Sequence, residues 1–287
     1  MEKIKKALEL AGRNRLDKVV DLPPESNPAY ESPLIDEPPA EQIIPRPPVE
    51  DTMSAPLRFT QTRVVEVPAS TFAANRIVAA GPDSDAAHAF DLLSARVSGK
   101  LRENGWRSLA VVSPGPDEGK TLTALNLGVA LAKNEERTAL VVDMDFRRPS
   151  VASYLGLAPV HGYEHVLGAQ ASLEDVLVSP GIDRFAVLPA AGPANNAGSL
   201  VDSSRARQLA AELKGRYHNR VVLFDLPPLL AYGDAHSFLE NVDAVLLVVA
   251  DGITKDEQLD ESLKMLGRFN LLGTVLNRTA TAPAGYR

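Results

Sequence analysis

The chain has 287 residues, of which 30 are basic, 37 are acidic, 45% are hydrophobic and none is cysteine. This size and composition predict one large folded domain with appendages, and the absence of cysteine excludes a disulfide scaffold or a thiolate metal site. The acidic balance and an aromatic content of only 5% argue against nucleic acid as a partner. The longest apolar run, residues 244–250, is too short to span a bilayer, and the charged N-terminus does not resemble a signal peptide. We therefore expect a cytoplasmic protein.

The net charge of −7 is concentrated in one segment of the chain. Residues 21–57 carry one basic and eight acidic side chains and hold ten of the 22 prolines. Proline-rich acidic sequence cannot bury a core or close helical hydrogen bonds, so this segment is expected to be an extended, disordered linker. It serves either as a passive spacer or as a specific proline-rich ligand.

A short basic helix is expected before the linker, because Ile4, Ala7, Leu8 and Ala11 follow helical spacing. An isolated helix of this length is marginal in water, so it either docks on a partner or frays. The expected organisation is a helix in 1–20, a linker and lead-in over 21–82, a folded domain over 83–280 and a tail over 281–287.

From about residue 84 the pattern changes to a helix followed by short apolar runs alternating with helical stretches. Continuous apolar strands between helices predict an α/β fold of three layers with a mostly parallel sheet. The helices are expected over 84–103, 121–134, 203–217, 232–240 and 255–268. The strands are expected over 108–113, 138–145, 184–190, 220–226, 243–250 and 271–277.

The first of these strands leads through a turn into Gly119-Lys120-Thr121 and a helix, which is the context of a phosphate-binding P-loop. A helix N-terminus offers unpaired N–H groups to phosphate, Lys120 adds a positive charge, and the Thr121 hydroxyl suits Mg²⁺. The match is incomplete, because Pro114 stands where the strict pattern has glycine. The candidate nucleotide-binding residues in this loop are Pro116, Asp117, Glu118, Gly119, Lys120, Thr121 and Leu122.

Polar residues follow three further strands, where ligands bind in open α/β sheets. Asp143 and Asp145 end the second strand and are expected to share one side of it, suited to Mg²⁺ coordination or to proton abstraction. Asp225 ends an apolar strand in the Walker B arrangement, in which an aspartate helps to hold Mg²⁺. Asn277 and Arg278 end the last strand, and Asn277 is a candidate for reading the adenine edge.

These motifs carry a resemblance to a known family. The sequence GKT, then VVDMDFRRP, then LFDLPP is similar to the bacterial tyrosine autokinases of capsule and exopolysaccharide biosynthesis. The segments MEKIKKALELA and GWRSLAVVSP resemble in particular the subgroup encoded with exosortase-linked systems. The resemblance covers about residues 85–278 and the first dozen residues.

The resemblance implies an ATP- and Mg²⁺-dependent kinase that transfers the γ-phosphoryl group to tyrosine. Lys120, Asp143 and Asp145 would then be catalytic, and Thr121, Asp143 and Asp225 would form the metal site. The implied partners are a membrane chain-length-determinant protein, which would hold the kinase at the inner membrane as a peripheral protein, and a second copy phosphorylated in trans.

Two departures from the family pattern keep alternatives open. Relatives end in a tyrosine cluster, whereas Tyr286 is the only tyrosine after Tyr232 and is the one possible phosphoacceptor in the tail. The helix before the P-loop has His88, Asp91 and Ser94 where relatives carry a glutamate and two arginines for ring assembly. The alternatives are a partitioning-type ATPase switch without kinase activity and a nucleotide-binding scaffold. Gly115 counts against the switch, because those proteins have lysine there.

Overall fold

The structure, a computed structural model, describes residues 62–133 and 137–279. The expected helix in 1–20, the linker up to residue 61 and the tail with Tyr286 lie outside the described residues. Across the described part of the chain, no helix combines the length and the apolar character that a membrane span needs.

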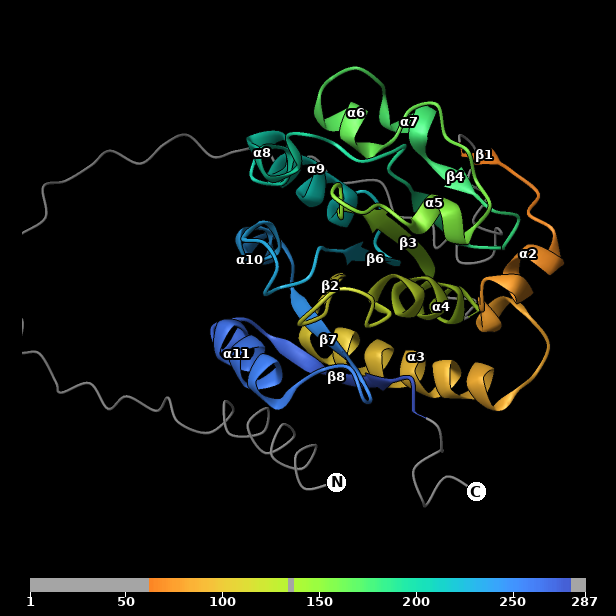
Figure 1. Cartoon of the computed structure of the whole chain (residues 1–287). Coiled ribbons are helices and arrows are strands. Elements are labelled where there is room, and N and C mark those ends of the chain that lie inside the picture. The colour runs from red at the N-terminus through yellow and green to blue at the C-terminus, as the bar shows by residue number, and fades with distance from the viewer. Residues whose placement is uncertain (1–61, 134–136, 280–287) are drawn as a thin grey trace, which may run out of the picture.

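One mostly parallel sheet organises the described domain (Figure 1). Its strand order is β1-β4-β5-β3-β6-β2-β7-β8, and only β4 and β5 pair antiparallel. The six expected strands all form, each within a few residues of its expected bounds. The strands are β1 (Arg63–Val64), β2 (Ser108–Val112), β3 (Thr138–Asp143), β4 (Val178–Ser179), β5 (Phe185–Leu188), β6 (Arg220–Asp225), β7 (Ala244–Ala250) and β8 (Leu271–Asn277).

Helices cover both faces of this sheet, which confirms the expected three-layer fold (Figure 1). On one face lie α2 (Ala69–Ala74), the 3-10 helix η1 (Val78–Ala80), α3 (Asp85–Asn104), α4 (Lys120–Ala132) and α5 (Val151–Tyr154). On the other lie α6 (Tyr163–Leu167), α7 (Leu173–Val176), α8 (Ala197–Val201), α9 (Ser204–Gly215), α10 (Asp234–Phe238), the 3-10 helix η2 (Leu239–Asn241) and α11 (Asp256–Leu266).

The central strands feed two separate cores because successive side chains of a strand point to opposite faces. In β6, Val222 and Phe224 pack under α9 and α10, whereas Val221 and Leu223 pack against α4. Every residue of β6 is buried, which explains why its sequence is continuously apolar rather than alternating.

Helix α4 fits tightly between the sheet and α3, and Leu122 is its only residue that is not buried. Gly128 makes this close approach possible. A Cβ atom there would lie 2.7 Å from Phe185 Cε2 and 2.9 Å from Val141 Cγ2. The helix that follows the P-loop is therefore fixed against the sheet by close packing.

The sequence pattern predicts that the folded domain starts at residue 83. In the structure, the packed domain starts earlier. Residues 62–82 supply β1, α2 and η1, and they bury Phe72, Ile77 and Ala79 in the core under α4. The buried Asn126 of α4 fastens this segment, because its Oδ1 accepts the Ala79 N–H at 2.9 Å. Residues 62–82 have no long stretch of apolar residues at helical or strand spacing. The sequence pattern therefore places them in the lead-in and not in the folded domain.

Candidate active site

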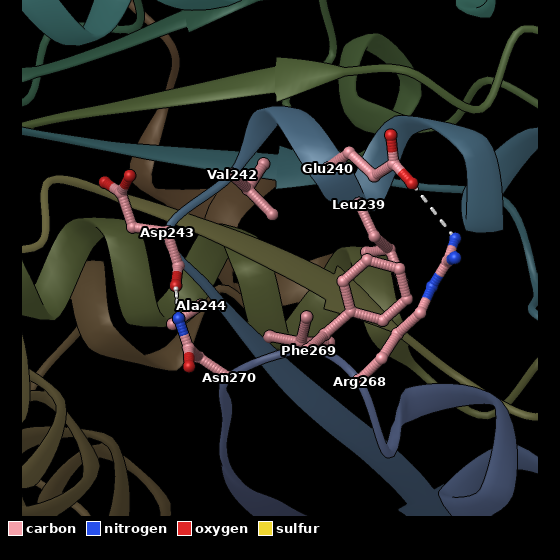
Figure 2. Close-up of a pocket in the computed structure, with 9 residues that line it drawn as sticks. Leu239, Glu240, Val242, Asp243, Ala244, Arg268, Phe269 and Asn270 are labelled. Carbon is pink, nitrogen blue, oxygen red and sulfur yellow. Dashed lines mark hydrogen bonds and ion pairs between the residues drawn. The ribbon is translucent and has the colours of Figure 1, made fainter. Parts of the chain in front are cut away.

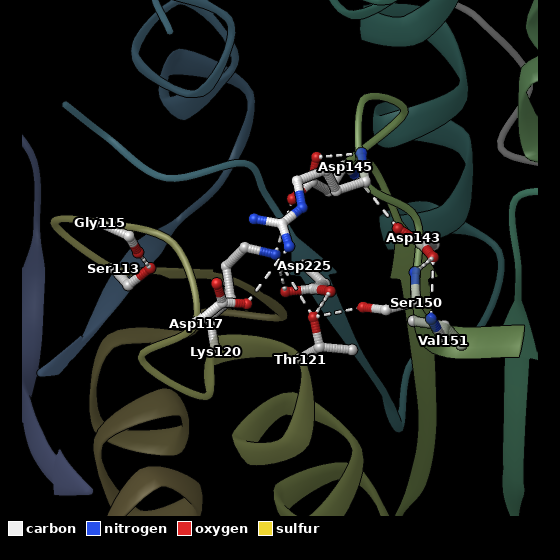
Figure 3. Close-up of polar contacts among 11 residues, drawn as sticks. Ser113, Gly115, Asp117, Lys120, Thr121, Asp143, Asp145, Ser150, Val151 and Asp225 are labelled. Carbon is white, nitrogen blue, oxygen red and sulfur yellow. Dashed lines mark hydrogen bonds and ion pairs between the residues drawn. The ribbon is translucent and has the colours of Figure 1, made fainter. Parts of the chain in front are cut away.

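Five of the predicted site residues lie close together at the carboxyl edge of the central strands (Figure 3), namely Lys120, Thr121, Asp143, Asp145 and Asp225. Asp143 of β3 and Asp225 of β6 are direct neighbours in the sheet register, and Lys120 and Thr121 open α4 beside them. The side chains of Lys120, Thr121, Asp145 and Asp225 form one connected group of contacts. This is the edge where open α/β sheets bind ligands.

Lys120 is the one lysine in this group and bridges two carboxylates. Its Nζ lies 2.9 Å from Asp145 Oδ2 and 3.5 Å from Asp225 Oδ1. Burial alone would lower the pKa of Lys120, but attraction to Asp225 and Asp145 outweighs it and raises the pKa above its ordinary value. The ammonium group therefore stays charged at any physiological pH.

Thr121 connects the P-loop to the Walker B aspartate. Its hydroxyl donates to Asp225 Oδ2 at 2.5 Å and accepts a hydrogen bond from Ser150 Oγ at 3.0 Å. Burial raises the pKa of Asp225, while Lys120 and Thr121 oppose that rise. No sequence motif indicates Ser150, which the chain brings to the site after the turn that follows Asp145.

Asp143 and Asp145 have different contacts, although the sequence predicts that they share one side of the strand. Strand β3 ends at Asp143, and Asp145 lies in the following turn beside Lys120. The Asp143 Oδ2 atom accepts the N–H groups of Ser150 and Val151 at 3.1 and 3.0 Å (Figure 3). Asp143 therefore holds the chain after β3 in place, and Asp145 is the aspartate that reaches the lysine.

The donor set fits Mg²⁺ with a nucleotide. Two buried aspartates, Asp145 and Asp225, contact Lys120, and Asp225 Oδ1, 3.5 Å from Lys120 Nζ, accepts no hydrogen bond from the described residues. Within residues 62–133 and 137–279, no three His, Cys, Asp or Glu side chains are placed to hold a metal unaided. Mg²⁺ usually keeps several waters and adds phosphate oxygens to one or two protein ligands, so Thr121 and Asp225 are sufficient.

The two carboxylates of the P-loop, those of Glu118 and Asp117, have different surroundings. Glu118 is buried, and its carboxylate accepts a hydrogen bond from Thr254 Oγ1 at 2.8 Å. Burial raises the pKa of Glu118, which Thr254 partly counters. Asp117 is exposed, adopts a left-handed φ of 60° and lies 3.5 Å from the guanidinium of Arg148. Pro116 is exposed and Leu122 is half-buried.

The end of β8 is fastened to the P-loop. Asn277 Nδ2 donates to Glu118 O at 2.9 Å, and Arg278 Nη2 donates to Asp117 O at 2.7 Å. Asn277 Oδ1 also accepts the Arg278 N–H at 2.9 Å. In this arrangement the Asn277 amide shapes the loop backbone, and the adenine-reading role stays a prediction.

Arg147 lies beside the site rather than in it. Its guanidinium pairs with Asp234 at 2.7 Å and stacks 4.2 Å from the centre of the Tyr232 ring. The Cβ position of Gly198, near the start of α8, is 3.0 Å from Asp234 Oδ1. Asp234, the first residue of α10, therefore lies against both Arg147 and α8, a position that the sequence does not indicate.

A surface pocket of about 320 Å³ lies at the amino ends of β7 and β8, away from the P-loop (Figure 2). Its charged groups are largely paired with each other. Arg268 lies 3.1 Å from Glu240, and Asn270 Nδ2 donates to the Asp243 carbonyl at 2.9 Å. None of its lining residues belongs to the P-loop or to the other predicted site residues, so the candidate active site stays at the opposite edge.

Comparison with known proteins agrees with this geometry. The tyrosine-protein kinase YwqD of Bacillus subtilis (strain 168) is 31% identical over 173 residues, which cover 60% of this chain and 72% of YwqD. The succinoglycan biosynthesis transport protein ExoP of Rhizobium meliloti (strain 1021) is 30% identical over 210 residues, or 71% of this chain and 26% of ExoP. ExoP is thus about four times as long as the region that it shares with this chain. No family model matches the chain.

Solved structures of kinases and ATPases also resemble this chain in fold. The kinase domain of the Escherichia coli tyrosine kinase ETK superposes with a TM-score of 0.64 at 25% identity, covering 78% of this chain and 87% of that domain. The septum site-determining protein MinD of Pyrococcus horikoshii, complexed with Mg-ADP, gives a TM-score of 0.52 at 26% identity, covering 62% and 72%.

The fold is that of a P-loop nucleotide-binding protein. The relatives narrow this class, and the chain belongs to the family of bacterial tyrosine-protein kinases of capsule and exopolysaccharide biosynthesis. This confirms the family that the three motifs indicate.

Proposed function

We propose that the chain binds ATP with Mg²⁺ and transfers the γ-phosphoryl group to tyrosine as a regulator of exopolysaccharide synthesis. The observation that carries this proposal is the convergence of Lys120, Thr121, Asp145 and Asp225 within one set of contacts at the carboxyl edge of the sheet. Phosphoryl transfer needs positioning and charge stabilisation more than covalent chemistry, and this set offers both.

Each residue receives a role from its contacts. Lys120 exchanges its two carboxylate partners for phosphate oxygens and stabilises the negative charge on the transferred group. Asp145 thereby loses Lys120 and is free to accept the proton of the attacking tyrosine hydroxyl. Thr121 and Asp225 hold Mg²⁺, which neutralises phosphate charge when bound. Asp143 positions the turn that carries Asp145.

Tyr286 is the proposed phosphoacceptor, in a neighbouring copy of the chain. A membrane chain-length-determinant protein is the proposed activating partner, and it would hold the kinase at the inner membrane. The relatives ETK and ExoP support this assignment, since each extends far beyond the region that matches this chain.

Incubation with labelled ATP and Mg²⁺ tests the proposal, with wild type, Lys120→Met, Asp145→Asn and Tyr286→Phe compared. Label on the wild-type protein that is lost in all three variants supports the kinase. A matched control is Tyr232→Phe, because Tyr232 packs on Arg147 outside the set of contacts and its substitution should leave the label intact.

Two other outcomes identify the alternatives. ATP hydrolysis without label on protein would refute the kinase in favour of a non-kinase ATPase switch, which the likeness to MinD supports. Absence of any nucleotide binding would leave only a scaffold in the polysaccharide machinery.

A further inference from the structure

Ser150 contacts the candidate active site from outside the three sequence motifs. It is the residue directly after the VVDMDFRRP segment, and it stands at the N-cap of α5. Its hydroxyl donates to Thr121 Oγ1 at 3.0 Å, a contact that Figure 3 shows. The proposed function gives a role to Thr121 and none to Ser150.

The hydroxyl of Ser150 does not perform the usual task of a serine at this position. A serine N-cap normally accepts an N–H group from the first turn of its helix. The Ser150 side chain accepts no such bond from the described residues. The serines that cap α3, α7 and α9 do accept one, namely Ser84, Ser172 and Ser203. Ser150 is therefore a cap residue whose side chain is directed elsewhere.

Asp143 supplies the acceptor that the start of α5 needs. Its Oδ2 atom accepts the N–H groups of Ser150 and Val151 at 3.1 and 3.0 Å. Because a carboxylate from β3 already satisfies these backbone groups, the Ser150 hydroxyl is left to contact Thr121.

The directions of the hydrogen bonds at Thr121 follow from the groups involved. A hydroxyl has one proton to donate and two lone pairs that accept. The Thr121 proton goes to Asp225 Oδ2 at 2.5 Å, because a carboxylate only accepts. Ser150 must therefore be the donor to Thr121, and it fills one lone pair. Lys120 Nζ donates to the same oxygen from 3.4 Å, which is a longer and weaker contact.

We propose that Ser150 is a positioning residue for Mg²⁺ and acts through Thr121. The inference rests on the proposed function, in which Lys120 turns from its partners to phosphate oxygens. That change frees one lone pair of the Thr121 hydroxyl. Asp225 and Ser150 still engage its proton and its other lone pair, so the hydroxyl is held in one orientation with a single lone pair available to the metal.

Calorimetric titration of the full chain with ADP tests the proposal, first with EDTA and then at increasing Mg²⁺ concentrations. ADP has no γ-phosphoryl group to transfer, so turnover does not disturb the titration. The Mg²⁺ concentration at half of the metal-dependent gain in ADP affinity, the Mg²⁺ midpoint, reports on the metal site. Ser150→Ala should raise this midpoint about tenfold or more, the usual effect of losing a group that orients a metal ligand. Its ADP affinity in EDTA should stay within about twofold of wild type.

Two further variants separate positioning from helix capping. Glycine is nearly as good an N-cap as serine, whereas alanine is a poor one. A capping role would therefore spare Ser150→Gly, but the positioning role predicts the same rise in the Mg²⁺ midpoint as for Ser150→Ala. The matched control is Ser153→Ala, since the Ser153 hydroxyl donates to Ser150 O at 2.8 Å rather than to Thr121. It should leave the midpoint unchanged, and thermal unfolding checks that each variant is folded.

Several results would overturn the proposal. One is a Mg²⁺ midpoint of Ser150→Ala within about twofold of wild type. Another is an equal loss of ADP affinity with Mg²⁺ and with EDTA, and a third is wild-type behaviour of Ser150→Gly. In these three cases the wild-type chain still binds ADP with Mg²⁺, so the proposed function stands. A wild-type chain whose ADP affinity does not respond to Mg²⁺, or that binds no ADP, would overturn this inference together with the proposed role of the metal.

Discussion

The contact between Gly119 and Asn277 lets the geometry of the P-loop be tested by a double-mutant cycle. Gly119 has a φ of +91°, and a Cβ atom there would lie 2.0 Å from Asn277 Nδ2. Gly119→Ala therefore imposes a left-handed conformation on alanine and also expels the Asn277 amide. The expelled amide loses its hydrogen bond to Glu118 O.

The expected magnitudes follow from these two effects. The left-handed conformation costs alanine about 1–2 kcal/mol, and the lost hydrogen bond about 1 kcal/mol, so Gly119→Ala should destabilise by roughly 2–3 kcal/mol. Asn277→Ala removes the same hydrogen bond and should cost about 1 kcal/mol. Because that bond can be lost only once, the double variant should cost roughly 2–3 kcal/mol, about 1 kcal/mol less than the sum.

Urea unfolding of the four proteins measures the cycle, with Gly105→Ala as the matched control. Gly105 also has a positive φ, +68°, but its Cβ position has no neighbour within 4 Å. It should show the conformational cost alone and no coupling to Asn277. Additivity of Gly119→Ala and Asn277→Ala within about 0.3–0.5 kcal/mol would refute the reasoning.

Three further predictions concern the core, the metal site and pH. Gly128→Ala should destabilise by about 1–2 kcal/mol in urea unfolding, because overpacking against Phe185 exceeds the roughly 1 kcal/mol that alanine gains in a helix. A result at or above wild-type stability would show that α4 can shift. Asp225→Asn should weaken nucleotide binding at least about tenfold with Mg²⁺ and much less with EDTA, as measured by calorimetry. Equal losses under both conditions would contradict a metal role. Burial and the neighbouring Asp225 raise the pKa of Asp143 from 3.8 to about 8. The folded state then holds this proton more tightly than the unfolded state, so the metal-free protein should lose stability as the pH rises from about 4 to 8. Asp143→Asn should flatten that slope in thermal unfolding, and an unchanged slope would exclude Asp143 as its cause.

Burial explains how far the fold is predictable from the sequence. Strands such as β6 and β7 are buried on both faces, so their sequences are unbroken apolar runs that stand out from the surrounding helices. The two-residue strands β1 and β4 and the helices α5 to α8, of four or five residues each, have no such pattern. They depend on contacts with distant parts of the chain, as with the bond between Ala79 and Asn126.

The candidate site also has one part that the sequence predicts and one part that it does not. Gly119, Lys120, Thr121 and Asp225 are recognisable because each sits at the end of a regular element, where backbone geometry dictates its direction. The different orientations of Asp143 and Asp145 depend on where β3 ends and how the next turn folds back. No local pattern encodes that turn, and the contact of Ser150 with Thr121 follows from it.

The attachment of β8 to the P-loop has a consequence for any tyrosine that approaches the site. Asn277 and Arg278 touch the P-loop backbone, so the C-terminal tail begins at the edge of the candidate active site. Tyr286 follows Arg278 by only eight residues, which span at most about 26–29 Å. Tyr286 of the same copy therefore stays within that distance of the P-loop, whereas a tyrosine of a neighbouring copy does not.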